Sequence, residues 1–337
     1  MRFLGKLVLI LMTAAALWLC WAVLLPSPPR QEFVMLRPGW STRRIAQELQ
    51  NTGVIRSANA FLLWHYLVRP KSLKAGEYRF TQPAAVRQVH ARLVRGDIYI
   101  HTAVIPEGFN MFDIAAAIEA AGLGSQQEFL NAARAGTTLI SDIDPQATSL
   151  EGYLFPDTYE FTRTQTLNDM IGVMVRRFRQ EAKAIGLIAN GGAPPTTPVD
   201  VHRVVTLASI VEKETAVPEE RPLVASVYYN RLAKNIALNA DPSVIYAALL
   251  AGRYQGTIYM SDLQADSPYN TYKYAGLPPG PIANPGRESL KAALHPADTD
   301  YYYFVSDNNG RHRFARSLDE HSRNVALYRR AVANQDR

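Results

Sequence analysis

The sequence has a single cysteine in 337 residues, and this scarcity excludes several kinds of protein. One cysteine rules out an internal disulfide and every metal site built from several thiolates. That residue, Cys20, stands in an apolar run, where a thiol behaves as a small hydrophobe. The seven histidines are dispersed and no H-E-x-x-H motif occurs, so a metal-dependent hydrolase is not expected. We therefore expect neither a metal ion nor a cofactor.

The sequence also lacks a strong charge of one sign. It has 36 Lys and Arg against 30 Asp and Glu, and the basic residues do not gather on one helix face, so we expect no nucleic-acid partner. The net charge of +6 suits anionic lipid headgroups or an anionic polymer, and it suits a merely solvated surface equally well. With 47% apolar and 20% charged residues the chain is globular, and its length indicates two domains and an appendage.

One long apolar segment is present, from Leu7 to Leu25, and it follows Arg2 and Lys6. Nineteen residues rising about 1.5 Å each give about 28 Å, enough to cross a hydrocarbon core of about 30 Å. A cleavable signal peptide is the alternative, but its apolar region usually has about 7 to 15 residues and no small-x-small site follows Leu25. We expect an uncleaved anchor over 7–25, with residues 1–6 in the cytoplasm. The chain after residue 25 should then lie on the opposite side of the membrane. In a bacterium that is the cell-wall side.

The remaining chain has the pattern of an α+β protein in two parts. A Pro-rich linker over 26–32 precedes a small α+β module over 33–98, and a larger mixed α/β domain occupies 99–337. The module is expected to contain a strand at 33–36, a helix capped by Ser41 or Thr42, a helix after Ser57, a strand at 76–80 and a helix at 84–94. This order resembles the LysM-like module of cell-wall proteins, which implies binding to peptidoglycan. A spacer that holds the larger domain off the membrane is an equal alternative.

Two segments of the larger domain stand out beside a strand near Tyr99 and a helix from Met111. The stretch Glu151–Phe161, "EGYLFPDTYEF", combines aromatic rings with carboxylates, as sugar sites do, because rings stack on sugar faces and carboxylates accept from hydroxyls. A packed loop is the equal alternative for this stretch. The stretch 189–198, "ANGGAPPTTP", predicts an exposed loop.

The stretch "LASIVEKET" turns from apolar to acidic inside a predicted helix over 199–215. Glu214 shares a helix face with Leu207, Ile210 and Val211, whereas Glu212 points to the opposite side. A carboxyl group held against apolar surface loses hydration, which raises its pKa and allows it to act as a general acid near neutral pH. The alternative is a glutamate that reaches water or an arginine such as Arg221 or Arg231.

The segments that follow favour the interpretation of Glu214 as a general acid. The next predicted helix has a buried face that ends in Tyr228 and Arg231, so Arg231 faces inward with Tyr228. Asp241 is expected to cap a helix whose first turn contains Pro242. The stretch 276–282, "GLPPGPI", predicts a rigid loop with little conformational freedom to lose on binding a ligand.

Several short motifs follow one another in a fixed order along this part of the chain. They are "ASIVEKET", Glu220-Arg221, "VYYNRL", "ADPSVIY", "YNTY", "GLPPGPI" and Asn284-Pro285-Gly286. With these motifs the sequence resembles the endolytic murein transglycosylases of the YceG-like (MltG) family from about Phe33 to the C-terminus, and the resemblance extends to the anchor. The usual transglycosylase signature with Glu-Ser is absent, as this resemblance leads one to expect. Ala240 and Ser243 depart from the family pattern, at helix-start positions that leave the chemistry undisturbed.

The resemblance implies cleavage of the β-1,4 bond between N-acetylmuramic acid and N-acetylglucosamine in peptidoglycan glycan strands, without water. It matches Glu214 to the catalytic acid/base, the residue that the helix pattern also selects. The residues expected to orient Glu214 and the sugar are Glu212, Arg231, Asp241, Asn270 and Tyr272.

The same resemblance implies an anchor in the bacterial inner membrane, with the catalytic domain on the periplasmic or extracytoplasmic side. Peptidoglycan synthases are the expected protein partners, and cleavage of nascent strands would then terminate their elongation. The alternative is a membrane-anchored peptidoglycan-binding protein with no catalytic activity.

Overall fold

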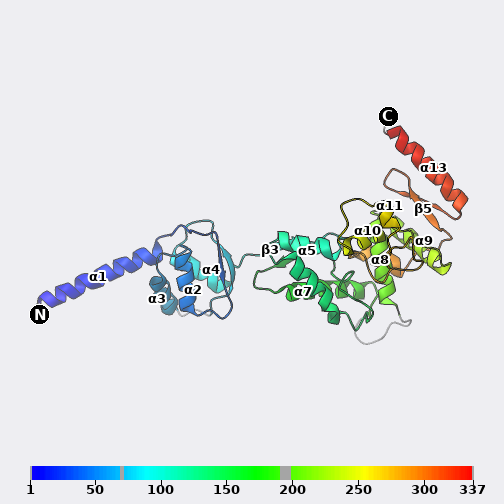
Figure 1. Ribbon diagram of the computed structural model, residues 1–337. Helices are drawn as coiled ribbons and strands as arrows, with labels where there is room; N and C mark the ends of the chain where they lie inside the picture. The colour runs from blue at the N-terminus through cyan, green and yellow to red at the C-terminus, as the bar shows by residue number, and fades with distance from the viewer. Residues whose placement is uncertain (1, 69–71, 190–198, 336–337) are drawn as a thin grey trace. The chain divides into compact units, whose positions relative to one another are not determined.

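The computed structural model describes residues 2–68, 72–189 and 199–335. The chain forms two compact units: unit 1 comprises Met1–Thr102 with Glu160–Thr166, and unit 2 comprises Ala103–Tyr159 with Leu167–Arg337. Both contain helices and short strands, so the fold is α+β, as the sequence predicts (Figure 1). The loop predicted at 189–198 lies almost wholly outside the described residues.

Unit 1 follows the predicted order of strand, helix, helix, strand and helix. Its two strands pair antiparallel, with Phe33 opposite Arg79 and Leu36 opposite Gly76. Ser41 caps the second helix, as expected, by accepting a hydrogen bond from the Arg44 backbone N–H at 3.3 Å. The elements are α1 (Arg2–Leu24), β1 (Phe33–Leu36), α2 (Thr42–Asn51), α3 (Ala58–Val68), β2 (Gly76–Arg79) and α4 (Val86–Arg95).

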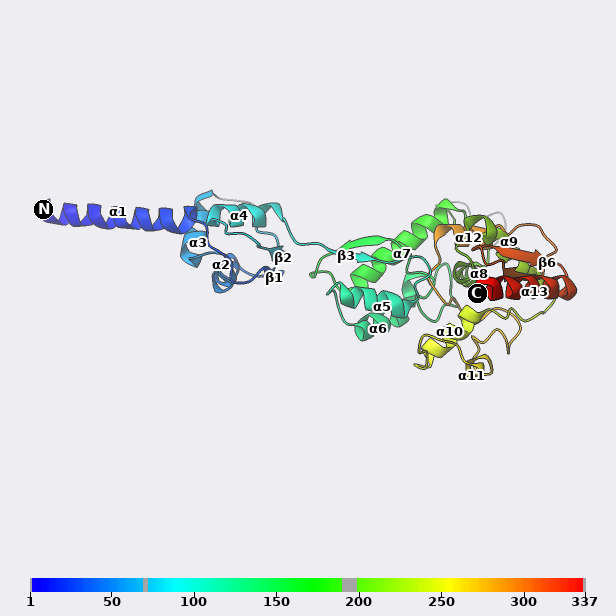
Figure 2. The same cartoon turned by 90° about the horizontal axis from the view of Figure 1, so that it is seen from above.

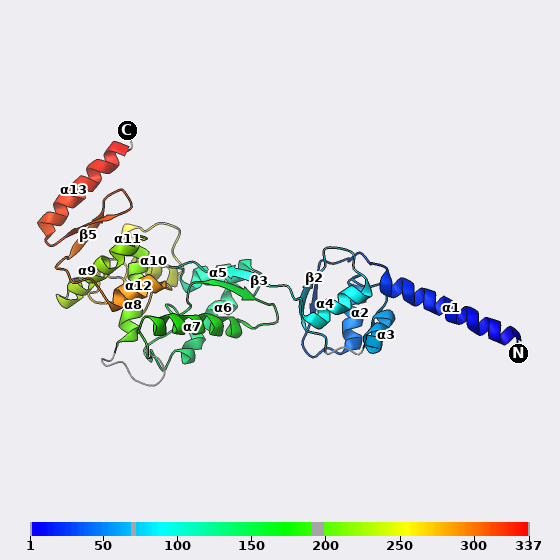
Figure 3. The same cartoon turned by 180° about the vertical axis from the view of Figure 1, so that it is seen from behind.

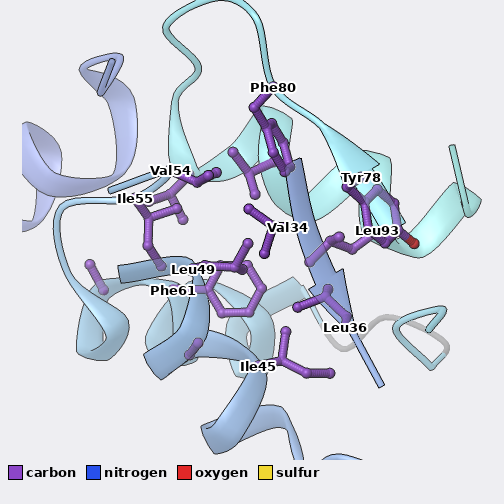
Figure 4. Packing of buried hydrophobic residues seen from close by; sticks show 14 of the residues in the cluster. Val34, Leu36, Ile45, Leu49, Val54, Ile55, Phe61, Tyr78, Phe80 and Leu93 are labelled. Atoms are coloured by element: carbon purple, nitrogen blue, oxygen red, sulfur yellow. The ribbon is translucent and has the colours of Figure 1, made fainter. Parts of the chain in front are cut away.

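The hydrophobic core of unit 1 lies between its helices and its two-stranded sheet (Figure 4). Leu36 and Tyr78 from the sheet and Leu49, Phe61 and Leu93 from the helices are fully buried in it. The last turn of α1 belongs to the same core, since Ala22 and Val23 are buried there. The order of elements matches a LysM-like module, and this identity remains a prediction.

Among the described residues, one helix is long and apolar enough to cross a membrane. It covers Lys6–Leu24, 19 residues with a mean hydropathy of 2.5, at the N-terminus. The Pro-rich segment after it is tied to unit 1: Ser27 and Ala84 exchange two backbone hydrogen bonds, and the Arg30 N–H donates to the Thr52 carbonyl at 2.9 Å. The segment between α1 and β1 is therefore held to unit 1 by backbone hydrogen bonds.

Unit 2 is mainly helical. β3 pairs with β4. The boundary between the two units falls inside each of these strands, after Thr102 and after Tyr159. β5 and β6 form an antiparallel hairpin beside α13, which Figures 1 and 3 show near the C-terminal end of the chain. The strands are β3 (His101–Val104), β4 (Thr158–Phe161), β5 (Tyr303–Ser306) and β6 (His312–Ala315), with short 3₁₀ helices at Gly136–Leu139 and Pro218–Glu220. The helices are α5 (Met111–Ala120), α6 (Gln126–Ala135), α7 (Leu167–Ala184), α8 (Val201–Glu214), α9 (Arg221–Ala233), α10 (Asp241–Leu250), α11 (Met260–Leu263), α12 (Arg287–Leu294) and α13 (Leu318–Gln335).

Helix α8 is the centre of unit 2 and packs against α9, α10 and α12. Asp200 caps it by accepting from the Arg203 N–H at 3.0 Å. Five consecutive residues, 207–211, are completely buried, so the helix has no polar side along this stretch. The side opposite Leu207, Ile210 and Val211, where the helix pattern places Glu212, is therefore buried along this stretch as well, because neighbouring helices surround α8.

The aromatic stretch Glu151–Phe161 is a packed segment, so the second of its two alternatives holds. Tyr153 and Leu154 are fully buried. The buried carboxylate of Glu151 accepts from the Met111 N–H at 2.9 and 3.1 Å and from the Asn284 amide at 2.7 Å. This carboxylate thus joins the start of α5 to the chain just before α12.

Candidate active site

A cavity of about 300 Å³ in unit 2 contains the residue that the sequence selects as the acid. Its walls come from the C-terminal end of α8, from α9, from the chain before α10, and from β5 and α13. It is lined by Glu214, Tyr228, Arg231, Leu238, Asn239, Asp241, Tyr272, Phe304 and His321.

Glu214 is the last residue of α8, so its side chain extends past the packed part of the helix into this cavity. Loss of hydration raises the pKa of its carboxyl group to about 7, and the charge of Asp241 acts in the same direction. A hydrogen bond from the Tyr228 hydroxyl to Oε1, at 2.8 Å, opposes the rise, as do the charges of His312 and Arg231. The raised pKa keeps the protonated form of Glu214 accessible near neutral pH, which suits a group that gives and then takes a proton.

Glu212 lies in a different environment, although it too is withdrawn from water. Its side chain is only 5% exposed, although the helix pattern places it opposite the apolar face that contains Glu214. Its Oε1 accepts from Arg221 at 3.1 Å, and its Oε2 accepts from the Gly286 backbone N–H at 2.9 Å. Arg221 also lies 3.6 Å from Glu107. With both oxygens occupied, Glu212 holds α8 to α9 and to the start of α12.

Arg231 lines the cavity with Tyr228, and its donors go to backbone carbonyls. Nε donates to the Tyr302 carbonyl at 2.7 Å, and Nη1 donates to the Leu238 carbonyl at 2.7 Å. Burial lowers the pKa of this guanidinium. Arg231 thus joins the chain before α10 to the chain entering β5, and it places a positive charge beside Glu214.

Asp241 and Tyr272 form one wall of the cavity. The Tyr272 hydroxyl donates to Asp241 Oδ1 at 2.5 Å. The expected capping role of Asp241 was wrong by one position: it is the first residue of α10, and Ala240 is the N-cap. The Thr271 hydroxyl oxygen accepts from the Ala240 N–H at 2.9 Å, which leaves the Asp241 carboxylate available to the cavity.

Asn270 is fully buried and acts on the cavity through its neighbour. Its amide donates to the carbonyls of Leu263 and Ala265, at 2.9 Å each, and its Oδ1 accepts from the Tyr272 N–H at 3.1 Å. These bonds fix the turn that presents Tyr272. The structure therefore brings Glu214, Arg231, Asp241 and Tyr272 into the cavity, whereas Glu212 and Asn270 support it from outside the lining.

His321 and Phe304 line the cavity and were not predicted from the sequence. His321 stacks on Tyr303, with ring centroids 5.1 Å apart, and its buried Nδ1 has no hydrogen-bond partner in the part of the chain that the structure describes. Burial and the charge of Arg231 lower its pKa. Phe304 meets the Tyr228 ring edge-on, with centroids 5.9 Å apart. Both residues are far from Glu214 in the sequence, and their segments carry no motif that points to a site.

The cavity supplies the Glu214 carboxyl group with its raised pKa, a phenol hydrogen-bonded to that group, the Asp241 carboxylate, one cation and several aromatic faces. Such a set can transfer a proton to and from a sugar oxygen while rings contact the sugar. Over residues 2–68, 72–189 and 199–335, no three His, Cys, Asp or Glu side chains come together in a way that could hold a metal ion.

The comparisons with known proteins find one family and relatives that share one name. The sequence model of the YceG-like family matches residues 34–327. A protein of Bacillus subtilis (strain 168) named endolytic murein transglycosylase is 35% identical over 305 residues, covering 86% of this chain and 82% of that protein. The protein of the same name from Streptococcus pneumoniae serotype 2 (strain D39) is 28% identical over 319 residues, covering 86% of this chain and 56% of that protein.

Among solved structures, a YceG-like protein from Listeria monocytogenes is 32% identical to this chain, with a TM-score of 0.55. The match covers 86% of this chain and 98% of the other. The family model spans nearly the whole chain outside the N-terminal apolar helix, and it includes every residue that lines the cavity. The chain therefore belongs to the YceG-like family.

Proposed function

We propose that the protein is an endolytic murein transglycosylase. It cleaves the β-1,4 bond between N-acetylmuramic acid and N-acetylglucosamine within peptidoglycan strands and leaves 1,6-anhydro-N-acetylmuramic acid ends. Relatives that carry this name support the proposal. The observation that carries it is Glu214, a carboxyl group with a pKa of about 7 in a cavity lined with aromatic rings.

One carboxyl group suffices when water takes no part. Protonated Glu214 donates its proton to the glycosidic oxygen, and the bond from that oxygen to C1 of the muramic acid breaks. The C6 hydroxyl of the same sugar forms the new bond to C1, and its proton returns to the Glu214 carboxylate. No atom is gained or lost, and attack within one ring gains from proximity. An ordinary glycosidase requires a second carboxylate to activate water or to attack the sugar.

The neighbouring residues have distinct roles in this proposal. Tyr228 occupies Oε1 of Glu214, so Oε2 is the oxygen that exchanges the proton. Arg231 stabilises the carboxylate after its proton has left. The Asp241 carboxylate and the Tyr272 oxygen, whose proton goes to Asp241, accept hydrogen bonds from the sugar hydroxyls. Glu212 and Asn270 are positioning residues that hold α8 and Tyr272 in place.

The rest of the chain sets where cleavage takes place. We assign α1 as a single-pass anchor in the inner membrane, with units 1 and 2 on the periplasmic or extracytoplasmic side. The module over 33–98 contributes affinity for the glycan or a fixed position near it. Partnership with peptidoglycan synthases would let cleavage terminate the elongation of nascent strands.

The decisive experiment is mass spectrometry of the products released from purified glycan strands. Anhydro ends weigh one water less than reducing ends, so the products of a transglycosylase differ from those of a hydrolase. Asp241 makes this comparison sharp, because it is a second carboxylate in the same cavity and could serve a hydrolytic mechanism. Reducing ends would overturn the transglycosylase, and intact strands would favour a protein that only binds peptidoglycan.

A further inference from the structure

Helix α3 exposes a row of large apolar side chains on the surface of unit 1. Leu63 is 43% exposed, Tyr66 67%, Leu67 64% and Val68 43%. Its other face is buried, with Phe61 and Ala60 in the core. A contiguous apolar surface of this kind marks an interaction site.

The exposed end of α3 lies alongside α1, the helix that can cross a membrane. The two helices pack together, as Figures 2 and 3 show from two sides. An apolar groove of about 290 Å³ runs between them. It is lined by Ala16, Cys20, Val23 and Leu24 of α1 and by Trp64 and Leu67 of α3.

The depth of this groove follows from the helix rise. The span Lys6–Leu24 has 19 residues, so its midpoint falls at the fifteenth residue of the chain. Ala16 to Leu24 therefore occupies the outer half of the span, about 12 Å along the helix axis. Leu67 lines the same groove as Ala16 and Cys20, so a bilayer that surrounds α1 also surrounds the end of α3.

The attachment between α1 and unit 1 is rigid, so this depth is fixed. Ala22 and Val23 are buried in the core of unit 1. The Arg56 guanidinium lies over the Trp21 ring at 4.8 Å and donates to the Pro26 carbonyl at 2.8 Å. Unit 1 is therefore held directly at the end of the span.

The other side of Trp64 provides groups suited to lipid headgroups. Trp64 also lines a hollow of about 680 Å³ that contains Arg87, Arg92 and Arg95 of α4. Tryptophan favours the boundary between acyl chains and headgroups, and basic side chains next to it favour anionic phosphates. The apolar groove and the basic hollow thus follow the order of layers in a phospholipid leaflet.

We propose that unit 1 is partly immersed in the outer leaflet of the membrane that α1 crosses, with Leu63, Tyr66 and Leu67 of α3 among the acyl chains. This inference rests on the proposed anchor, because it places the bilayer by means of α1. It adds that unit 1 docks on the lipid surface through a second helix and does not hang from a free linker.

The test measures the depth of single nitroxide labels in the full chain, reconstituted in bilayers of phosphatidylethanolamine and phosphatidylglycerol. Cys20→Ser removes the native thiol, and Leu67→Cys, Leu11→Cys or Gln47→Cys then accepts the label. All three native side chains are exposed, so labelling disturbs little packing, and melting curves verify the fold. Leu11 reports the anchor, and Gln47, on α2, is the matched control within unit 1. Collision rates with oxygen and with a water-soluble nickel chelate give the depth of each label.

We expect the Leu67 label to resemble the Leu11 label. For both, the ratio of the collision rate with oxygen to the collision rate with the chelate should be at least several-fold higher than for the Gln47 label. A Leu67 label as accessible to the chelate as the Gln47 label, with Leu11 still in lipid, would overturn the immersion of α3 and leave the anchor intact. A Leu11 label in water would remove the anchor itself. A Leu67 label that is shielded only after glycan strands are added would assign the face to glycan and reject the lipid.

Discussion

Two glutamates separated by one residue at the end of α8 lie in different surroundings. Glu214 enters the cavity, where its carboxyl group has a pKa near 7, whereas both oxygens of Glu212 are held by Arg221 and the Gly286 N–H. The hydrogen-bond partners of the two carboxylates therefore distinguish them. Spacing on the helix selects Glu214, and the cavity contains the same residue.

Replacing Glu214 by Gln should therefore lower the rate of glycan cleavage by at least about a hundredfold, because the transferable proton is lost. The folded state should survive, since a neutral amide is no harder to bury than a protonated acid. The measurement is the initial rate of anhydromuropeptide release, with thermal melts alongside. An active, folded Glu214→Gln protein would show that the acid lies elsewhere.

Glu212→Gln is the matched control for that experiment. It leaves the buried charge of Arg221 with only the longer contact to Glu107, so the free energy of unfolding should fall by about 1 to 3 kcal/mol. Cleavage per folded molecule should fall much less than in Glu214→Gln. Equal losses of activity in the two folded variants would leave the two carboxylates indistinguishable and contradict their separate roles.

The pKa of Glu214 makes cleavage dependent on pH. A general acid with a pKa of about 7 loses its proton as the pH rises through 7, so the rate should fall there. Tyr228→Phe removes the hydrogen bond that stabilises the carboxylate, which should raise the pKa and shift the alkaline limb of the profile to higher pH. Initial rates between about pH 5 and pH 9 test this order. A shift toward lower pH would mean that Tyr228 does not donate to the carboxylate.

The same pKa affects stability in a defined direction. The folded-state pKa of Glu214 lies above the ordinary value of 4.5, so its contribution to stability is complete below pH 4.5 and is lost as the pH rises through about 7. Glu151 also has a raised pKa of about 7, because it is buried, and contributes with the same sign. Stability measured in Glu214→Gln should consequently keep part of this dependence.

At the level of elements, local signals predict much of the fold. The capping residue Ser41 and the predicted helix after Ser57 place the starts of α2 and α3 almost to the residue. Signals that compete locally do not: aspartate is a favoured capping residue, yet Asp241 is the first residue of α10, and Ala240, with extended backbone, is the N-cap. His321 enters the cavity through the packing of α13 on β5, and sequence spacing has no information about that contact.

The Pro-rich loop that the sequence predicts to be rigid packs against Gly152, which gives an element-level prediction. Gly152 has φ +88°, and an added Cβ would lie 2.5 Å from Pro281 and 2.8 Å from Val205. Gly152→Ala should therefore lower the free energy of unfolding by about 2 to 4 kcal/mol, through backbone strain and overpacking. Chemical denaturation measures the loss.

Gly186→Ala provides the control, because Gly186 has a similar φ of +77° and no atom within 4 Å of an added Cβ. Its loss should be about 1 to 2 kcal/mol, the cost of left-handed backbone alone. If both substitutions cost the same, Pro281 and Val205 make room for the added Cβ, and overpacking at Gly152 is absent.

For the whole molecule, an uncleaved anchor should keep the protein on membranes through a high-salt wash, with Arg2 still present in the mature chain. The length of the apolar helix and the absence of a cleavage site motivate this expectation. Cell fractionation and mass spectrometry of the N-terminus measure it. A soluble product that begins after Leu25 would contradict it.

A soluble chain that begins at Ile98 should still cleave isolated glycan, because every residue lining the cavity belongs to unit 2. The truncation removes Glu77, the ion-pair partner of Arg163 at 2.8 Å. Arg163 does not line the cavity, so the loss of this ion pair should leave the site intact. Cleavage rates and melting curves of the shortened and full chains test the division of labour. A folded but inactive product would show that unit 1 takes part in the chemistry.

The far wall of the cavity has a consequence for the order in which the chain is made. Phe304 and His321 follow Glu214 by 90 and 107 residues, and the Tyr302 carbonyl that accepts from Arg231 comes just before them. While the ribosome is still producing those residues, the cavity lacks two of its nine lining side chains, and Arg231 lacks one of its carbonyl partners. Under the proposed function, a chain that stops before residue 302 therefore has an incomplete active site.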